Sequence, residues 1–335
     1  IFEENRREKA ITYIWHLVTE VLGIDPERIW VSYFGGGKLG DHEVPEDKLT
    51  YQAWCDVGVP ENRLIGLGMN HNYWVQGGGI NNGSSERRKC GANTELFYDS
   101  GAAKACSPNC HPGCRCGRFV EFSNSLFVSH HLNSKTNTLT LMDDPFTETV
   151  IGNERVAMIL QNVPSVFETT AYRPVLETIR QFVTQTTLPP ALIRESERVI
   201  ADHMRALYVL VADGAPPPGK NGRERIIKLL IRRVLTRQII LGITSAEFLP
   251  ILLTLLYQMS QVESFMPFLQ TKTVIMKYFE TELPRFSKTI ERGKRVLESM
   301  LIQNQNSLPS HEQLFFLEKQ WGLPRLLAKV ILREN

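Results

Sequence analysis

The sequence predicts an α+β protein in which an antiparallel sheet with flanking helices is followed by an all-helical domain. In the first 165 residues, short segments rich in β-branched and aromatic residues mix with a few helical segments, without the regular strand–helix alternation of a parallel sheet. From residue 172 onward, long segments with apolar residues three and four positions apart dominate. A chain of 335 residues is long enough for two domains, which we expect to cover 1–168 and 169–335.

The first domain begins with a helix. Apolar residues at helical spacing predict this helix over residues 5–22, and Gly23 and Pro26 end it. A second helix is expected over 51–57, and a third over 153–162. The strand candidates are 29–34, 63–67, 72–76, 95–98, 118–122 and 138–142.

The second domain is expected to consist of helices alone. Proline clusters at 189–190 and 216–218 separate its apolar-periodic segments, because proline removes a backbone donor and interrupts a helix. The predicted helices cover 172–186, 194–213, 222–241, 245–257, 262–279, 282–304 and 311–318.

Charge is informative here through its distribution, since the formal net charge is only +2. Residues 220–237 hold seven Lys or Arg and a single acid, Glu224. Such clustering suits phosphate binding, and it is also typical of a solvated helix face. Both interpretations stay open on this feature alone.

The ends and the apolar runs of the chain predict its location. The first residues are charged rather than apolar, which argues against a signal peptide. The longest apolar run, 248–257, is interrupted by Pro250 and is too short to span a bilayer. We therefore expect a cytoplasmic protein without a membrane partner. The chain opens on Ile1 rather than Met, which predicts a fragment of a longer protein.

Cysteines gather in one short segment. Cys106, Cys110, Cys114 and Cys116 follow one another at spacings typical of a thiolate metal site, although not in the familiar paired Cys-x-x-Cys pattern. Structural zinc is the favoured interpretation. Disulfides suit secreted chains, and free surface thiols are the third alternative. We expect a Cys-rich insertion at about 90–116, with Cys90 as a competing ligand.

The segment Gly152-Asn-Glu-Arg155 predicts a strand-to-helix corner that delivers an arginine into a site. By itself it is more often an exposed arginine at a helix start. Its companions are Asn72-Tyr-Trp74, Glu121-Phe-Ser-Asn124 and Ala201-Asp-His-Met-Arg205. In that order these segments resemble the alanyl-tRNA synthetase family, which belongs to the class II aminoacyl-tRNA synthetases. The resemblance extends from about Phe2 to about Val330.

This resemblance implies an incomplete class II catalytic sheet, followed by a tRNA-recognition domain. It implies ATP-dependent activation of alanine, or a similar small amino acid, as an aminoacyl adenylate and its transfer to tRNA, with Mg²⁺ as the companion of ATP. Arg155 matches the arginine that grips the ATP triphosphate, and Gly152 would let the nucleotide lie close to the backbone. Glu121 matches an acid near the metal and ATP.

The same resemblance implies an amino-acid pocket. Trp74 matches its aromatic wall, Asn124 lies near the ammonium, and Glu148 stands where the family has an aspartate that pairs with the ammonium. Leu126 replaces a valine, so the accepted amino acid could differ from alanine. Glu121 and Asn124 are three apart, which in a strand places them on opposite faces unless a bulge intervenes.

The helical half resembles the family's tRNA-binding domain. Arg225, Lys228 and Arg232 recur at helical spacing as a basic stripe, which we expect to contact acceptor-stem phosphates. The preceding loop departs from the family pattern, because the asparagine that helps read the stem is replaced by Lys220 or shifted to Asn221. The expected tRNA-binding residues are Lys220, Asn221, Arg223, Arg225, Lys228 and Arg232.

Two alternatives to an alanine–tRNA ligase-like enzyme remain. The first is a paralogue that forms the adenylate and passes the amino acid to an acceptor other than tRNA. The second is a non-catalytic tRNA-binding protein. The class II arginine motif that contacts the α-phosphate is expected upstream of Ile1, so we expect little adenylate formation from these residues alone.

Overall fold

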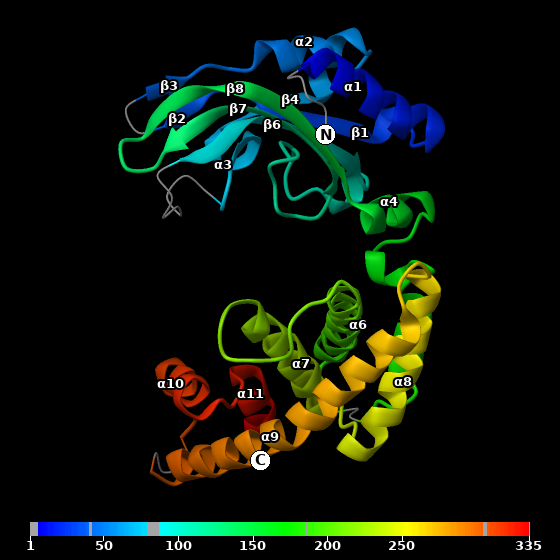
Figure 1. Cartoon of the computed structure of the whole chain (residues 1–335), viewed down its shortest axis with the longest axis vertical. Helices are drawn as coiled ribbons and strands as arrows, with labels where there is room; N and C mark the ends of the chain where they lie inside the picture. Colours follow the sequence, from blue (N-terminus) through cyan, green and yellow to red (C-terminus); the bar gives the residue numbers. More distant parts are fainter. Residues whose placement is uncertain (1–5, 40–41, 79–86, 185–186, 304–306, 335) are drawn as a thin grey trace. The chain divides into compact units, whose positions relative to one another are not determined.

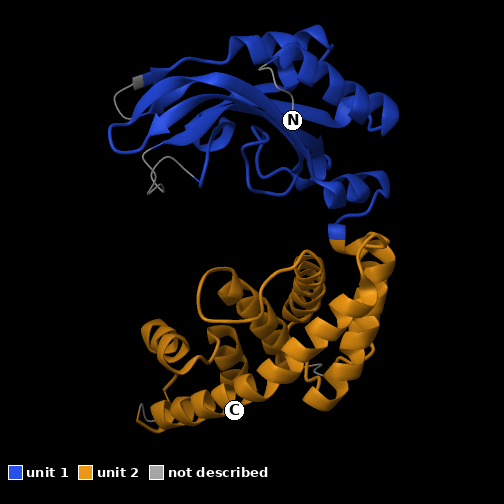
Figure 2. Ribbon diagram, in the orientation of Figure 1, with its two compact units in different colours: residues 1–166 blue, residues 167–335 orange. Residues whose placement is uncertain are grey.

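The computed structural model describes residues 6–39, 42–78, 87–184, 187–303 and 307–334. This described part divides into two compact units, Ile1–Val166 and Phe167–Asn335 (Figure 2). The sequence placed the boundary two residues later. Residue 5, where the first helix was expected to begin, lies outside the described residues.

The first unit is built on a mixed sheet (Figure 1). Its strand order is β4-β1-β6-β7-β8, with β5 pairing with β6, and the described neighbours are antiparallel except for β1 and β4. A separate hairpin joins β2 and β3. The strands are β1 (Ile29–Phe34), β2 (Gly37–Leu39), β3 (His42–Val44), β4 (Leu64–Leu67), β5 (Tyr73–Val75), β6 (Arg88–Asp99), β7 (Phe119–Asn133) and β8 (Thr138–Ile151).

The α+β fold class predicted from the sequence is confirmed, while the strand lengths differ. The predicted strands 95–98, 118–122 and 138–142 cover only parts of β6, β7 and β8. Polar residues on these strands interrupt the apolar alternation on which the prediction relied. The β2–β3 hairpin was not predicted, and neither was the short helix α3 (Met69–Asn72).

Helices cover one face of the sheet. In Figure 1, α1 (Arg7–His16) and α2 (Lys48–Asp56) lie together over this face, and Ile11, Trp54 and Phe127 are buried in the shared apolar core. A π-helical segment, Leu17–Val21, extends α1.

Helix α2 begins three residues before its predicted start. The Asp47 carboxylate accepts hydrogen bonds from the Thr50 backbone N–H at 3.2 Å and from the Thr50 hydroxyl at 2.8 Å, so it caps the helix. It also pairs with Arg7 of α1 at 2.9 Å. One buried carboxylate therefore starts α2 and joins it to α1.

A bulge in β7 decides which side chains share the opposite face. Leu96 pairs with Ser123, but Phe97 pairs with Glu121, so Phe122 is the extra residue. Because Glu95 pairs with Asn124, side-chain alternation then places Glu95, Glu121 and Asn124 on the same face, despite the three-residue spacing of the last two. We call this the site face.

The second unit is helical, as predicted. Its helices are α5 (Arg173–Arg180), α6 (Pro190–Ala212), α7 (Gly222–Ile240), α8 (Ser245–Val262), α9 (Phe268–Gln303), α10 (His311–Trp321) and α11 (Arg325–Glu334), and α4 (Asn153–Leu160) closes the first unit. Its core draws on α5 to α11, with Tyr208, Leu252 and Phe279 among its fully buried side chains. None of the described helices combines the length and the apolar character needed to cross a bilayer.

The prediction of separate helices at 262–279 and 282–304 was wrong. A single helix, α9, runs through Pro284. Proline removes only one backbone donor, and the buried side chains of Phe279, Phe286 and Ile290 lie on both sides of the break. Their burial stabilises the continuous helix. Helix α11 was not predicted.

Candidate functional site

The site face carries a network of buried and half-buried polar side chains centred on Glu95. One oxygen of its carboxylate accepts hydrogen bonds from the side-chain amides of Asn93 and Asn124, both at 3.2 Å. The other oxygen accepts one from the Ser32 hydroxyl at 3.3 Å. Asn72 of α3 donates in turn to Ser32 at 2.9 Å. Residues from three strands and one helix are thus joined around one carboxyl group.

The environment of Glu95 disfavours its negative charge. Burial raises the pKa of this carboxyl, the nearby Glu121 carboxylate raises it further, and the hydrogen bonds from Ser32 and Asn93 oppose the shift, leaving a pKa of about 7. Within the described residues, no cation pairs with Glu95. Two neighbouring carboxyl groups on one face therefore form a suitable place for a divalent cation.

Arg155 and Glu121 were predicted from distant segments, and the structure brings them together. The Arg155 guanidinium donates to the Glu121 backbone carbonyl at 2.7 Å and lies 3.6 Å from its carboxylate. Both side chains are partly exposed, so they remain accessible to a ligand. The Gly152 N–H donates to the Phe122 carbonyl at 2.9 Å, which fixes α4 against the bulged part of β7.

The backbone conformation at position 152 does not require glycine. Its φ is −81°, which any residue adopts, and an added Cβ would lie 3.5 Å from the Arg155 side chain, an ordinary contact. The close approach of a nucleotide to Gly152 stays a prediction. Gly91 is different, because a Cβ there would overlap the Phe127 carbonyl oxygen.

The predicted amino-acid pocket residues also share the site face. Trp74 packs with Leu126 in a small apolar cluster that includes Val128, Met142 and Phe146. Glu148 pairs across the strands with Leu126, and their side chains point to the same face. The register thus places an aromatic wall, an aliphatic residue and a carboxylate beside Asn124.

The sequence did not predict four members of this site: Ser32, Asn72, Asn93 and Glu95. Asn72 and Asn93 are buried, and each keeps a side-chain carbonyl oxygen without a hydrogen-bond partner among the described residues. The available signal was the strand segment Cys90–Glu95, in which Asn93 and Glu95 alternate and therefore face the same side. The sequence alone does not reveal which side this is.

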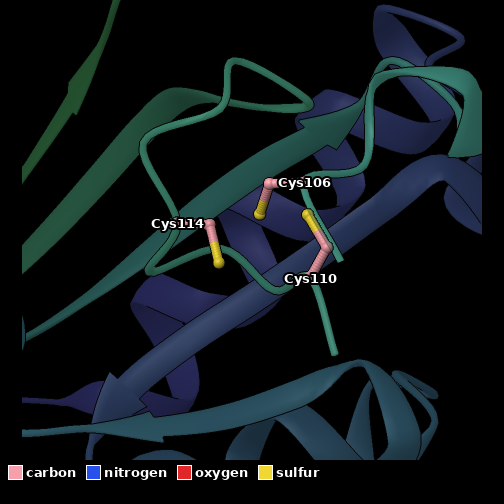
Figure 3. A group of neighbouring side chains, drawn as sticks. All are labelled: Cys106, Cys110 and Cys114. Atoms are coloured by element: carbon pink, nitrogen blue, oxygen red, sulfur yellow. The ribbon is translucent and has the colours of Figure 1, made fainter. Parts of the chain in front are cut away.

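The cysteine segment forms a compact group of thiols. The Sγ atoms of Cys106, Cys110 and Cys114 all lie within 4.8 Å of one another, and they point into a common space (Figure 3). The Sγ of Cys116 lies 3.5 Å from that of Cys110. Cys90 belongs elsewhere, since its thiol is buried in another apolar cluster and contacts the His130 carbonyl at 3.5 Å.

The structure thus brings together three of the four predicted ligands, with Cys116 beside one of them, and thiolate sulfur is a donor that structural zinc prefers. Hydrogen bonding among the thiols raises the pKa of Cys106 to about 12, since its neighbours compete for negative charge. A bound cation would relieve that competition. Cys110 packs with Phe97 and Phe119, so the loop is attached to strands β6 and β7.

The predicted tRNA-binding residues lie at the start of α7. Lys220, Asn221, Arg223 and Arg225 are exposed and Lys228 is half-buried. Arg232, also predicted as part of the basic stripe, is paired within the protein. Its guanidinium lies 3.4 Å from the buried carboxylate of Glu282 on α9. The surface between the cations is partly apolar, with Ile226 53% and Leu229 43% exposed.

The chain is similar to known proteins along its whole length. The family model described as tRNA synthetases class II (A) matches residues 2–335. The alanine–tRNA ligase of Natranaerobius thermophilus is 31% identical over 340 residues, covering 100% of this chain and 36% of that protein. That of Thermoanaerobacter sp. (strain X514) is 30% identical over 345 residues, covering 99% and 36%.

A third relative, the alanine–tRNA ligase of Clostridioides difficile (strain 630), is 28% identical over 339 residues. The chain spans 36% of the length of each of these relatives. The family model, in contrast, extends over nearly the whole chain, including both units. The chain therefore belongs to the class II (A) tRNA synthetase family.

Proposed function

We propose that this protein activates alanine, or a similarly small amino acid, with ATP and transfers it to tRNA. The observation that carries the proposal is the site face, where Arg155, Glu121, Glu95 and Asn124 lie beside the Trp74–Leu126 cluster. The names of the relatives support the choice of alanine and tRNA.

In the activation step, a carboxylate oxygen of the amino acid bonds to the α-phosphorus of ATP, and the bond to pyrophosphate breaks. This chemistry needs positive charge and positioning rather than a strong base. Arg155 supplies a guanidinium to the phosphate oxygens, and its hydrogen bond to the Glu121 carbonyl holds it in place. Glu95 and Glu121 would hold Mg²⁺, which neutralises phosphate charge when bound.

Recognition of the amino acid is assigned to the other end of this network. Glu148 and the Asn124 amide would bind its ammonium group, while Trp74 and Leu126 limit the space for its side chain. The Glu95 carboxylate accepts from the Asn124 amide and so fixes its orientation. The apolar cluster around Leu126 would form the wall of this pocket.

Acceptor recognition is assigned to the start of α7. The exposed cations Lys220, Arg223 and Arg225 would contact phosphates of the acceptor stem, and Asn221 precedes the first turn of the helix. Gly222 has a φ of +51°, so glycine suits this corner better than other residues. Arg232 contributes less, since Glu282 already neutralises it.

The cysteine group is proposed to bind structural zinc. Its ligands would be Cys106, Cys110, Cys114 and Cys116, an all-thiolate set typical of closed structural sites. The ion would cross-link the loop between β6 and β7 near the site face. It takes no part in the reaction.

Amino-acid-dependent ATP–pyrophosphate exchange, measured on the full-length product of the gene across the small amino acids, tests the proposed function. We expect exchange with alanine, lowered by a factor of about 100 or more in Arg155→Ala, since a phosphate-binding arginine contributes several kcal/mol to such transition states. Glu8→Gln, an exposed carboxylate change on α1, is the control. Absence of exchange with every amino acid would contradict the proposal.

The acceptor can be tested separately. Exchange without charging of tRNA would favour the paralogue that uses another acceptor, whereas tRNA binding without exchange would favour a non-catalytic role. The neutralised Arg232 and the exposed Ile226 and Leu229 on α7 are the features that favour a different acceptor.

A further inference from the structure

A cavity of about 690 Å³ lies on the first unit and is not used by the proposed function. It is formed near the β7–β8 turn, where β6 begins and β7 ends. Its size is typical of small-molecule sites. The residues that line it are Arg87, Lys89, His131, Met142, Asp143, Asp144 and Phe146.

Positive charge dominates one side of this cavity. Lys89 and His131 are direct cross-strand partners, and the Lys89 ammonium lies 5.0 Å from the centre of the Phe146 ring. Burial lowers the pKa of His131, and the positive charges of Arg87 and Lys89 lower it further, whereas Asp143 opposes them. The imidazole is therefore held neutral in a positive environment.

The polar atoms on this side are available for a ligand. The Nδ1 atom of His131 is buried and has no hydrogen-bond partner among the described residues. Lys89 forms no ion pair within 4.0 Å with a carboxylate of the described chain, even though two acids line the same cavity. An anionic group placed here would gain both a cation and a hydrogen-bonding imidazole.

Negative charge marks the other side. Asp143 and Asp144 are adjacent and exposed on β8, and neither is paired with a described cation. A purely anionic ligand would be repelled by them, and a purely cationic ligand by Lys89. Only a ligand that carries both charges complements the whole lining.

We propose that this cavity binds a zwitterionic small molecule, an amino acid or a short peptide, with its carboxylate against Lys89 and His131 and its ammonium against Asp143 and Asp144. Met142 and Phe146 form the apolar floor, and both also pack in the cluster with Leu126 and Trp74. The cavity therefore adjoins the candidate amino-acid pocket while using different charged residues. The proposal does not depend on ATP, tRNA or the proposed reaction.

The first test uses three matched probes with the full chain: glycylglycine, N-acetylglycine, which lacks the ammonium, and glycinamide, which lacks the carboxylate. Calorimetry gives each affinity, and the ¹³Cε1 resonance of His131 reports whether binding occurs in this cavity. We expect glycylglycine to bind at least five-fold more tightly than either other probe and to shift the His131 signal. Equal affinity for N-acetylglycine, or no response of His131, would overturn the proposal.

Variants provide the second test. Lys89→Met and the double change Asp143→Asn with Asp144→Asn should each weaken glycylglycine at least five-fold. The control Lys48→Met removes an exposed cation on α2 and should change the affinity less than two-fold. Unaltered binding of glycylglycine by both cavity variants would show that these charges do not contact the ligand and would overturn the proposal. If a variant fails to fold, the comparison of the three probes with the wild-type chain decides the question.

Discussion

At the scale of single residues, the negative charge of Glu95 is disfavoured by its surroundings, and Glu95 lies at the centre of the candidate site. It sits among neutral donors and beside another carboxylate, and its pKa of about 7 is far above the ordinary value of 4.5. Such shifts gather at sites where charge is used rather than where a fold is stabilised. A residue of this kind should trade stability against activity.

The stability consequence has a definite sign. Because the folded-state pKa lies above the unfolded value, the native state binds more protons between pH 4.5 and 7, and the free energy of unfolding falls as the pH rises through this window. The loss amounts to roughly 3–4 kcal/mol, since each pKa unit between 4.5 and about 7 contributes about 1.4 kcal/mol. We expect Glu95→Gln to flatten this dependence and to stabilise the protein at pH 8.

Urea denaturation with EDTA present, at several pH values, measures this effect. Glu312→Gln, at an exposed position on α10, serves as the control and should retain the wild-type slope. An unchanged pH dependence in Glu95→Gln would show that Glu95 does not titrate in this range.

Gly152 gives a second residue-scale prediction. Its φ of −81° and the 3.5 Å clearance of an added Cβ mean that Gly152→Ala should leave the unfolding free energy within about 0.5 kcal/mol of wild type. If a nucleotide lies against this backbone, the same methyl group should raise the KM for ATP several-fold. Pyrophosphate exchange and thermal unfolding separate the two effects. An unchanged KM would remove Gly152 from the ATP site.

At the scale of elements, the loop between β6 and β7 depends on its cysteines. Apolar contacts of Phe97 and Phe119 hold one side of it, and Asp99 pairs with Arg118 at 2.6 Å where the two strands meet the loop. Between these anchors, regular secondary structure is limited to the single helical turn Ala102–Lys104. A metal ion would be the main internal cross-link.

We therefore expect the purified protein to contain about one zinc ion, and a chelator to lower its melting temperature. Cys114→Ser should reduce the zinc content, whereas Cys55→Ser, on α2 outside the group, should not. Elemental analysis and thermal unfolding test this. Metal-free protein with an unaltered melting temperature would favour free thiols.

Helix α7 carries the element-scale prediction for RNA. Replacing Arg223, Arg225 and Lys228 by Ala should weaken binding of an acceptor-stem minihelix by roughly 10–100-fold at low salt. The affinity should also depend less on salt, because binding of the variant displaces fewer counterions from the RNA. A triple on α9, Lys277, Lys288 and Arg292, removes three exposed positive charges as the control. Equal losses in both triples would indicate non-specific attraction.

At the scale of the whole molecule, the two units have separate cores. The apolar core of the helical unit is formed entirely by residues after 166, whereas the clusters around the sheet lie before it. Units with their own cores commonly fold independently. We expect residues 167–335, expressed alone, to give a dispersed NMR spectrum and a cooperative unfolding transition. A molten spectrum would show that this unit needs the first.

Much of the architecture could be predicted from local patterns. Apolar spacing identified most helices of the second unit, and the glycine-to-arginine corner at 152–155 located the start of α4. Strand ends were less predictable, because polar site residues such as Glu121 and Asn124 break the alternation that marks a strand. The continuity of α9 through Pro284 also depended on tertiary burial, since local rules predict a break there.

By itself, the sequence determined the fold class and the two-part organisation of helices and strands, since these depend on residue type and spacing along the chain. Its resemblance to a known family added the candidate residues Arg155, Glu121 and Trp74. Only the tertiary structure decided which of these residues meet. The extra residue Phe122 turns Glu121 and Asn124 to one face, and cross-strand register then brings Glu95 beside them. Register and bulges depend on pairing between distant strands, and this pairing is not encoded by local spacing.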